Sequence, residues 1–277
     1  MNKNLISCAF AALILMSCGG NEPQNLQSHQ VTFHVPQVVA ETQPMNGPRR
    51  TPILTDDDGQ QMSDLFLFDG ATQIAHQTNA EAEFGTITVL LTAGTHHLHF
   101  IATRSTGLSY DEGILNCASL RPTFGKHYDL NVTGGSDENI SLERLTGQVV
   151  ITIEDEIPTG ASQLRIQMGD YYKGINPTTF AATRSGAFDQ TVNISGKVGL
   201  TNQSWTLNIL VPTYASESNT TFTLTATNAG GDIIGQATGT MTINSNTKTL
   251  LHGNLFKGTR SFLSLTTAWN AEEDVTF

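Results

Sequence analysis

Apolar and polar residues alternate with a period of two along most of this chain, from residue 31 to residue 265. Successive side chains of a β-strand point to opposite faces, so this period predicts half-buried strands. The predicted strands are 31–35, 64–68, 74–78, 87–91, 97–102, 128–132, 149–153, 164–168, 188–194, 205–209, 222–226, 233–237, 241–243, 250–256 and 262–265. No segment keeps the apolar spacing of an amphipathic helix over about ten residues. The pattern predicts an all-β protein built as sandwiches.

Turn residues between these segments indicate how the strands connect. Asp69-Gly70 and Ala93-Gly94-Thr95 each separate two predicted strands and predict hairpins, and Gly230-Gly231 marks a similar turn. A turn-rich segment at 134–137 precedes a fresh run of strands, so we place a domain boundary near 141–147. The two predicted sandwiches are 29–143 and 144–277, each of a usual size for one domain.

The start of the chain carries the most specific signal. Lys3 precedes an almost wholly apolar run at 5–16, with a Leu at the third position before Cys18 and a Ser directly before it. A basic residue, an apolar core and small residues at the cut follow one another as in a secretory signal. The core is shorter than the roughly 20 apolar residues that span a bilayer. Its end resembles a bacterial lipobox, which implies acylation of the Cys18 sulfur. We therefore predict a signal peptide at 1–17 and a lipidated tether at 18–28; an ordinary cleaved signal is the alternative.

Composition and charge narrow the class of protein. Apolar residues make up 38% of the 277 residues and charged residues only 14%, so Thr, Ser, Asn, Gln and Gly must cover much of the surface. The net charge of −11 argues against a nucleic-acid partner, because phosphate binding requires a basic surface. After cleavage before Cys18 the body keeps one further cysteine, Cys117, so no internal disulfide is expected there, and a small buried apolar role suits it best.

Three segments together resemble the fimbrillin superfamily of surface-lipoprotein pilins, and within it the FimB-like anchor and minor subunits. The first, Asp64–Gly70, is similar to a strand that the family carries early in its N-terminal domain. The second, Leu142–Ile153, is similar to the family's entry into its second domain, and an Ile-Pro pair follows it. The third, Asn246–Phe256, is similar to a C-terminal strand of the family, with Trp269 on the final segment. The resemblance covers both halves in order.

The resemblance implies two tandem transthyretin-like, Greek-key sandwiches. It also implies a structural and adhesive role in a fimbrium, with other fimbrial subunits as partners. Such subunits assemble when an extended strand of one fills a groove in the next. A lipid on Cys18 would hold the chain at the outer membrane, exposed at the cell surface, with a host or bacterial surface ligand as a further partner.

Arg50 decides which fimbrial role the resemblance implies. Shaft subunits of this family lose their first strand to an Arg-specific protease, and Arg49-Arg50 lies in a Pro-rich segment after the first predicted strand. Cleavage after Arg50 would make the chain a polymerising or tip subunit. Without cleavage it would be an anchor that keeps its first strand. A basic pair in a solvated loop is an equally good interpretation.

Other candidate chemistry is weaker. His97 and His99 point to one face of a predicted strand and would supply two metal ligands. A third ligand and a carboxylate must come from elsewhere in the chain. We therefore predict a polar outer face and no metal site. The acidic run 56–58 lacks the spacing of a calcium loop. Tyr171-Tyr172, expected in an exposed loop, favours the alternative of a surface glycan-binding lipoprotein. No catalytic motif occurs, so we predict neither an enzyme nor a cofactor.

Overall fold

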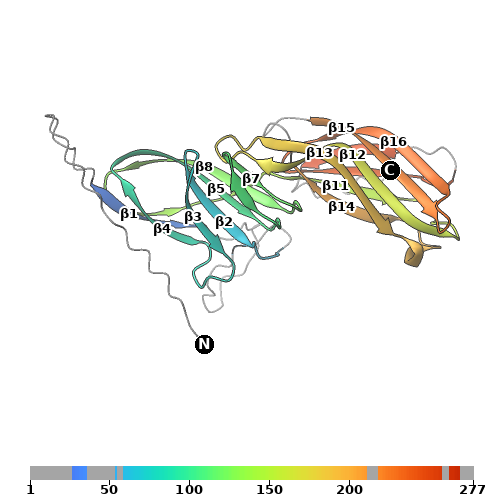
Figure 1. Cartoon of the computed structure of the whole chain (residues 1–277), viewed down its shortest axis with the longest axis horizontal. Helices are drawn as coiled ribbons and strands as arrows, with labels where there is room; N and C mark the ends of the chain where they lie inside the picture. Colours follow the sequence, from blue (N-terminus) through green and yellow to red (C-terminus); the bar gives the residue numbers. More distant parts are fainter. Residues whose placement is uncertain (1–26, 36–53, 55–58, 211–217, 258–261, 269–277) are drawn as a thin grey trace.

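The computed structural model describes residues 27–35, 54, 59–210, 218–257 and 262–268. The described chain is all-β apart from one short 3-10 helix, η1 (Ser195–Lys197), and folds as two lobes that follow each other along the longest axis (Figure 1). Within these residues no helix is long and apolar enough to cross a membrane. The predictions for Cys18, Arg50, the signal peptide, the run 56–58 and Trp269 lie outside the described residues.

The N-terminal lobe is a sandwich of two sheets with its core between them. Its strands are β1 (Ser28–His34), β2 (Asp64–Asp69), β3 (Thr72–Thr78), β4 (Thr86–Thr92), β5 (Gly94–Thr103), β8 (Thr123–Val132), β9 (Ser136–Asn139) and β10 (Glu143–Arg144). One sheet has the order β4-β1-β9 and the other β10-β8-β5-β2-β3. The inward positions that fill the core include Val31, Phe33, Leu65, Leu67, Ile87, Leu91, Leu98 and Phe100. These are the apolar positions of the period-two pattern.

The C-terminal lobe repeats this two-sheet plan with longer strands. Its strands are β11 (Gly147–Ile153), β12 (Ala161–Ile175), β13 (Ala182–Asn193), β14 (Gln203–Ile209), β15 (Ser218–Asn228), β16 (Ile233–Ile243), β17 (Thr247–Gly253) and β18 (Phe262–Ala268). One sheet has the order β14-β11-β17-β18; in the other, β12 pairs with β15 and β13, and β15 with β16. The core includes Val149, Ile151, Ile153, Leu164, Ile166, Phe222, Leu224 and Leu251.

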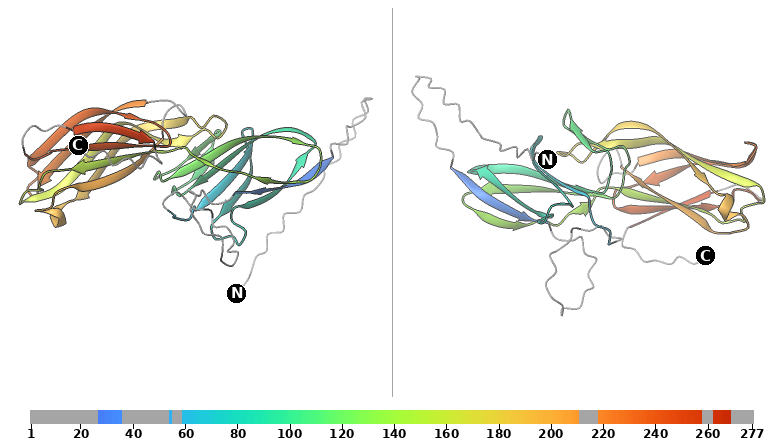
Figure 2. Two further views of the ribbon diagram at one scale, coloured as in Figure 1. Left: turned by 180° about the vertical axis from the view of Figure 1, so that it is seen from behind. Right: turned by 60° about the horizontal axis from the view of Figure 1, so that its bottom comes forward.

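A hairpin from the N-terminal half joins the two lobes. It consists of β6 (Ser109–Asp111) and β7 (Ile114–Asn116), and β7 extends the sheet of the C-terminal lobe through pairs of Leu115 with Ile175 and Asn116 with Gly174. The hairpin lies between the lobes (Figures 1 and 2). Apolar residues on the outer face of the β5-β2 region, among them Phe68, belong to the same core cluster as the C-terminal lobe. The lobes therefore share a packed junction.

Most predicted strands are present, and three connections differ from the prediction. Ala93-Gly94-Thr95 is a corner where the chain passes from one sheet to the other, because β4 pairs with β1 and β5 with β2 and β8. The segments 233–237 and 241–243 form the single strand β16, since Gly239 is accommodated within the strand against the ring of Phe222. The turn-rich segment at 134–137 leads into β9, whose polar sequence gives little strand signal.

Candidate functional site: the first strand and its groove

The first strand, β1, lies in the middle of its sheet. It pairs antiparallel with β4, from Ser28 opposite Thr92 to His34 opposite Thr86, and parallel with β9. β4 and β9 are both hydrogen-bonded to β1 and occupy opposite sides of it. Because neighbouring strands lie about 4.8 Å apart, β1 fills a slot that is two strand spacings wide.

One face of β1 carries apolar side chains into the core. Val31 and Phe33 are fully buried, and Val35 directly after the strand is 2% exposed. The ring of Phe33 meets that of Phe100 on β5 edge to face, with 5.2 Å between centroids. Full burial of a side chain of this size stabilises the folded state by about 1.5–3 kcal/mol. The apolar positions, two residues apart, are therefore what holds β1 in the slot.

Polar contacts complete the fit of β1. On the outer face the hydroxyls of Thr32 and Thr88 lie 3.2 Å apart. At the end of the strand the Val35 N–H donates to the Gly85 carbonyl, and the Ile140 N–H donates to the His34 carbonyl, both at 2.8 Å. All of these bonds except the first involve backbone groups, so they fix the register of an occupant without specifying its side chains.

The slot has the width of one extended strand, because β1 lies in it between β4 and β9. Without β1, β4 and β9 would each present unpaired N–H and C=O groups, and the core around Phe100 would lose one side. An exposed edge of this kind accepts a strand from another chain by β-augmentation, with affinity from the backbone bonds and specificity from alternate side-chain pockets. An occupant with apolar residues at the positions of Val31, Phe33 and Val35 satisfies both requirements.

The structure corrects the expected position of Tyr171 and Tyr172. Both lie on β12, at an irregularity of its pairing with β13, and not in an exposed loop. Tyr171 is 6% exposed, its ring packs 5.0 Å from that of Phe188, and burial raises its pKa to about 12. Tyr172 is only partly buried. The face of Tyr171 is therefore not open to a sugar ring, because the strand continues where a loop was expected.

His97 and His99 share one face of β5, as the alternation predicts, but only His97 is exposed, whereas His99 is buried at 8% exposure; each contacts a residue of β8. His97 Nδ1 is 2.7 Å from Asp129 Oδ1, and His99 Nδ1 is 2.6 Å from His127 Nδ1. Burial lowers the pKa of His99 and of His127, and any positive charge on His127 lowers the pKa of His99 further. In the part of the chain that the structure describes, no three His, Cys, Asp or Glu side chains are arranged around one point to hold a metal ion.

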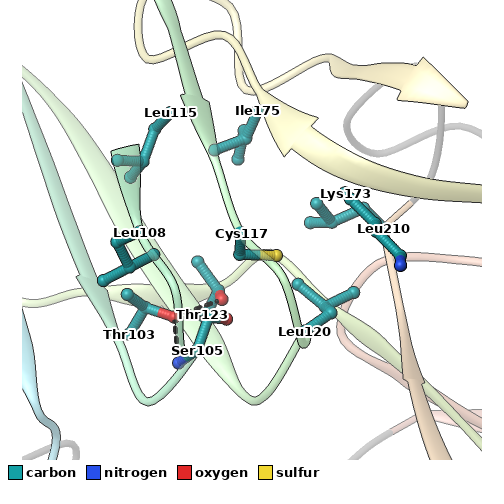
Figure 3. A pocket seen from close by; sticks show the side chains of 10 residues that line it. All are labelled: Thr103, Ser105, Leu108, Leu115, Cys117, Leu120, Thr123, Lys173, Ile175 and Leu210. Atoms are coloured by element: carbon teal, nitrogen blue, oxygen red, sulfur yellow. Dashed lines mark hydrogen bonds between the residues drawn. The ribbon is translucent and has the colours of Figure 1, made fainter. Parts of the chain in front are cut away.

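A small hollow lies at the junction of the lobes (Figure 3). Leu115, Cys117 and Leu120 of the N-terminal half face Lys173 and Leu210 of the C-terminal lobe across it. About 10 Å³ is open to the centre of a water molecule, which is about the space that one water requires. Cys117 is only partly buried, less than the small buried role predicted for it, but it packs against the core of the junction, and burial raises the pKa of its thiol.

The comparisons with known proteins address the fold. The chain is similar to the crystal structure of a candidate adhesin from Bacteroides ovatus, with a TM-score of 0.52 and 8% identity over 82% of this chain and 88% of that one. A candidate cell adhesion protein from the same species has a TM-score of 0.49 and 10% identity, over 90% of this chain and 99% of that one. The tip fimbrial protein Mfa3 from Porphyromonas gingivalis, with C-terminal truncation, has a TM-score of 0.46 and 11% identity, over 88% of this chain and 100% of that one.

Only the first of these similarities, with a TM-score of 0.52, bears on the architecture. At 8% identity the first of them shows a shared fold, a two-lobed all-β chain. The sequence matches no protein-family model and no curated protein.

Proposed function

We propose that this chain is a structural and adhesive subunit of a fimbrial type, held at the outer membrane by lipid on Cys18, and that its N-terminal lobe is a site of strand donation. The observation that carries the proposal is the central position of β1. It is the N-terminal strand of the described chain, and its alternate apolar residues complete a core that the rest of the lobe leaves open. The role is an anchor or a minor or tip component, and it requires no catalysis and no cofactor.

The three segments that resemble fimbrillins each contribute strands to the sheets of the two lobes. Asp64–Gly70 is β2 with its turn, and Asn246–Phe256 contains β17. Leu142–Ile153 contains β10 and β11 and so forms the passage from the first lobe into the second. Each segment thus contains a strand of a sheet that encloses a core. The shared fold with a candidate adhesin supports the same class of function.

The glycan-binding alternative has less support from the geometry. It rests on stacking of sugar rings on exposed aromatic faces, and Tyr171 is buried against Phe188. Trp205, the described tryptophan, is partly buried, packs against the core cluster and has Lys197 Nζ over its ring at 5.4 Å. We therefore prefer the fimbrial role.

Strand exchange can be tested with a peptide of β1. We expect the chain cut after Arg50 by an Arg-specific protease to take up a fluorescent peptide of residues 27–35 in place of its own strand. The Phe33→Ala form of the peptide is the matched control and should bind at least about 100-fold more weakly, because the lost burial costs about 3–5 kcal/mol. Size-exclusion chromatography with fluorescence detection measures uptake. Equal binding of both peptides, or no uptake by the cut chain, would contradict the acceptor role.

The lipid anchor has a separate test. Cys18→Ser is expected to abolish incorporation of labelled palmitate and to release the protein from the membrane fraction, because the Cys18 sulfur is the proposed point of acylation. Cys117→Ser is the control and should be labelled like the wild type, because its sulfur lies in the junction between the lobes. Metabolic labelling followed by gel autoradiography measures both. Undiminished label on Cys18→Ser would exclude acylation at that residue.

A further inference from the structure

Four side chains with metal-binding chemistry share one patch on the outer face of the N-terminal lobe. β5 contributes His97 and His99 and β8 contributes His127 and Asp129, so each strand presents two of them with one residue between. The register places His97 directly opposite Asp129 and His99 directly opposite His127. The sequence analysis identified His97 and His99 as two possible metal ligands. The pairing of β5 with β8 adds a third imidazole, His127, and a carboxylate, Asp129.

The spacing of the patch suits a single ion. Side chains directly opposite on antiparallel strands have Cβ atoms about 4.5–5.5 Å apart, and diagonal neighbours lie about 7–8 Å apart. An imidazole nitrogen binds zinc at about 2.0–2.1 Å and a carboxylate oxygen at about 2.0–2.2 Å. Imidazole and carboxylate side chains are long enough to span these distances, but only after a change of rotamer, because no three of them surround one point as they stand.

One half of the patch is held in place. His99 is 8% exposed, and its ring stands perpendicular to that of His127, with 2.6 Å between the two Nδ1 atoms. Phe180 of the C-terminal lobe stacks on His127 with 3.8 Å between centroids and 14° between planes. Phe180 thereby fixes the plane of the His127 ring. The two Nδ1 atoms face each other, and they must move slightly apart to bind one ion, because two nitrogens on a tetrahedral zinc lie about 3.3 Å apart.

The other half of the patch can move. The side chains of His97 and Asp129 are 67% and 76% exposed, and His97 Nδ1 lies 2.7 Å from Asp129 Oδ1. As they stand, the four groups form two adjacent pairs and not a converging set. Rotation of the two exposed side chains about their Cα–Cβ bonds would turn them toward the fixed pair. Such rotation involves no buried group.

We propose that His97, His99, His127 and Asp129 form a binding site for a divalent transition-metal ion, Zn²⁺ above all. Imidazole is a ligand of choice for zinc, and three imidazoles with one carboxylate complete a tetrahedral shell. A site with four protein ligands is structural, because no position is left open for a substrate. Asp129 adds negative potential at both His99 and His127, and Asp69 adds to it at His99, while Lys126 opposes it at His127.

The site would strengthen the lobe junction. The ion joins β5 to β8 across the sheet and holds His127 against Phe180, which belongs to the loop between β12 and β13. Metal binding is thereby expected to raise the melting temperature of the protein, since an ion that binds only the folded state stabilises it. This inference does not depend on the fimbrial role.

Isothermal titration of the full-length protein, purified without a histidine tag, with ZnCl₂ tests the site. We expect one equivalent to bind to the wild type. His127→Gln and His97→Gln should each weaken binding at least about 10-fold, which is the lower end of the loss when even a hydrogen-bonding partner of a ligand is removed. Both side chains are exposed, so both variants should fold, which circular dichroism checks. His252→Gln is the matched control, because His252 forms a similar pair with Glu154 at 2.8 Å in the other lobe.

Cobalt gives a second readout. Co²⁺ bound to the wild type should show the strong visible absorption of a tetrahedral centre, and His97→Gln should lose it. The proposal is overturned if the wild type shows no saturable zinc binding. It is also overturned if His97→Gln or His127→Gln binds zinc as the wild type does, or if His252→Gln weakens binding equally.

Discussion

Phe33→Ala is expected to lower the free energy of unfolding by about 3–5 kcal/mol, the usual cost of removing a buried phenylalanine ring. Phe33 is fully buried at the centre of β1 and contacts Phe100 on the facing sheet. Its loss removes apolar contact from both sheets of the N-terminal lobe at once. Urea denaturation followed by far-ultraviolet circular dichroism measures the change.

Thr32→Ala is the matched control for Phe33→Ala. Thr32 precedes Phe33 on the same strand but points outward, where its hydroxyl lies 3.2 Å from that of Thr88. The loss of one exposed hydrogen bond should cost about 1 kcal/mol or less. A similar loss of unfolding free energy in the two variants would mean that the apolar face of β1 does not hold the strand in the slot. The proposed strand exchange at this slot would then be contradicted.

Gly125→Ala is expected to destabilise the protein by about 1–3 kcal/mol through overpacking at the junction of the lobes. A Cβ atom at Gly125 on β8 would lie 2.8 Å from Leu145 Cδ1, 2.8 Å from Phe180 Cζ and 2.9 Å from the Phe100 carbonyl oxygen. The side chains of Leu145 and Phe180 must move away from β8, which loosens the contact between the lobes. Thermal unfolding measures the cost, and small-angle scattering should show a longer molecule.

Gly134→Ala is the control for Gly125→Ala. A Cβ at Gly134 would meet no atom within 4 Å, so the change should leave stability unaltered or raise it by about 0.4–1 kcal/mol through the unfolded chain. If Gly125→Ala behaves like Gly134→Ala, the junction is not closely packed at β8. The separation of the lobes in solution would then not depend on the contact with Phe180.

The functional groups that sequence reasoning missed were those whose partners lie on another strand. His127 and Asp129 follow the same one-residue spacing as His97 and His99, and this spacing is visible in the sequence. Their meeting depends on the pairing of β5 with β8, which places His99 opposite His127 across a separation of 28 residues. Phe180, which orients His127, comes from the other lobe. No local pattern indicates a contact of that kind.

The alternation of apolar and polar residues determined most strands and their buried faces, because the two-residue period is a local property of extended backbone. The burial of Val31, Phe33 and the later inward positions could be predicted in this way. Alternation does not state which strand lies beside which. The corner at Gly94, the joining hairpin β6–β7 and the insertion of β1 between β4 and β9 all depend on pairings between distant segments. Only the tertiary structure decided them, because backbone hydrogen bonds between strands carry almost no side-chain signature.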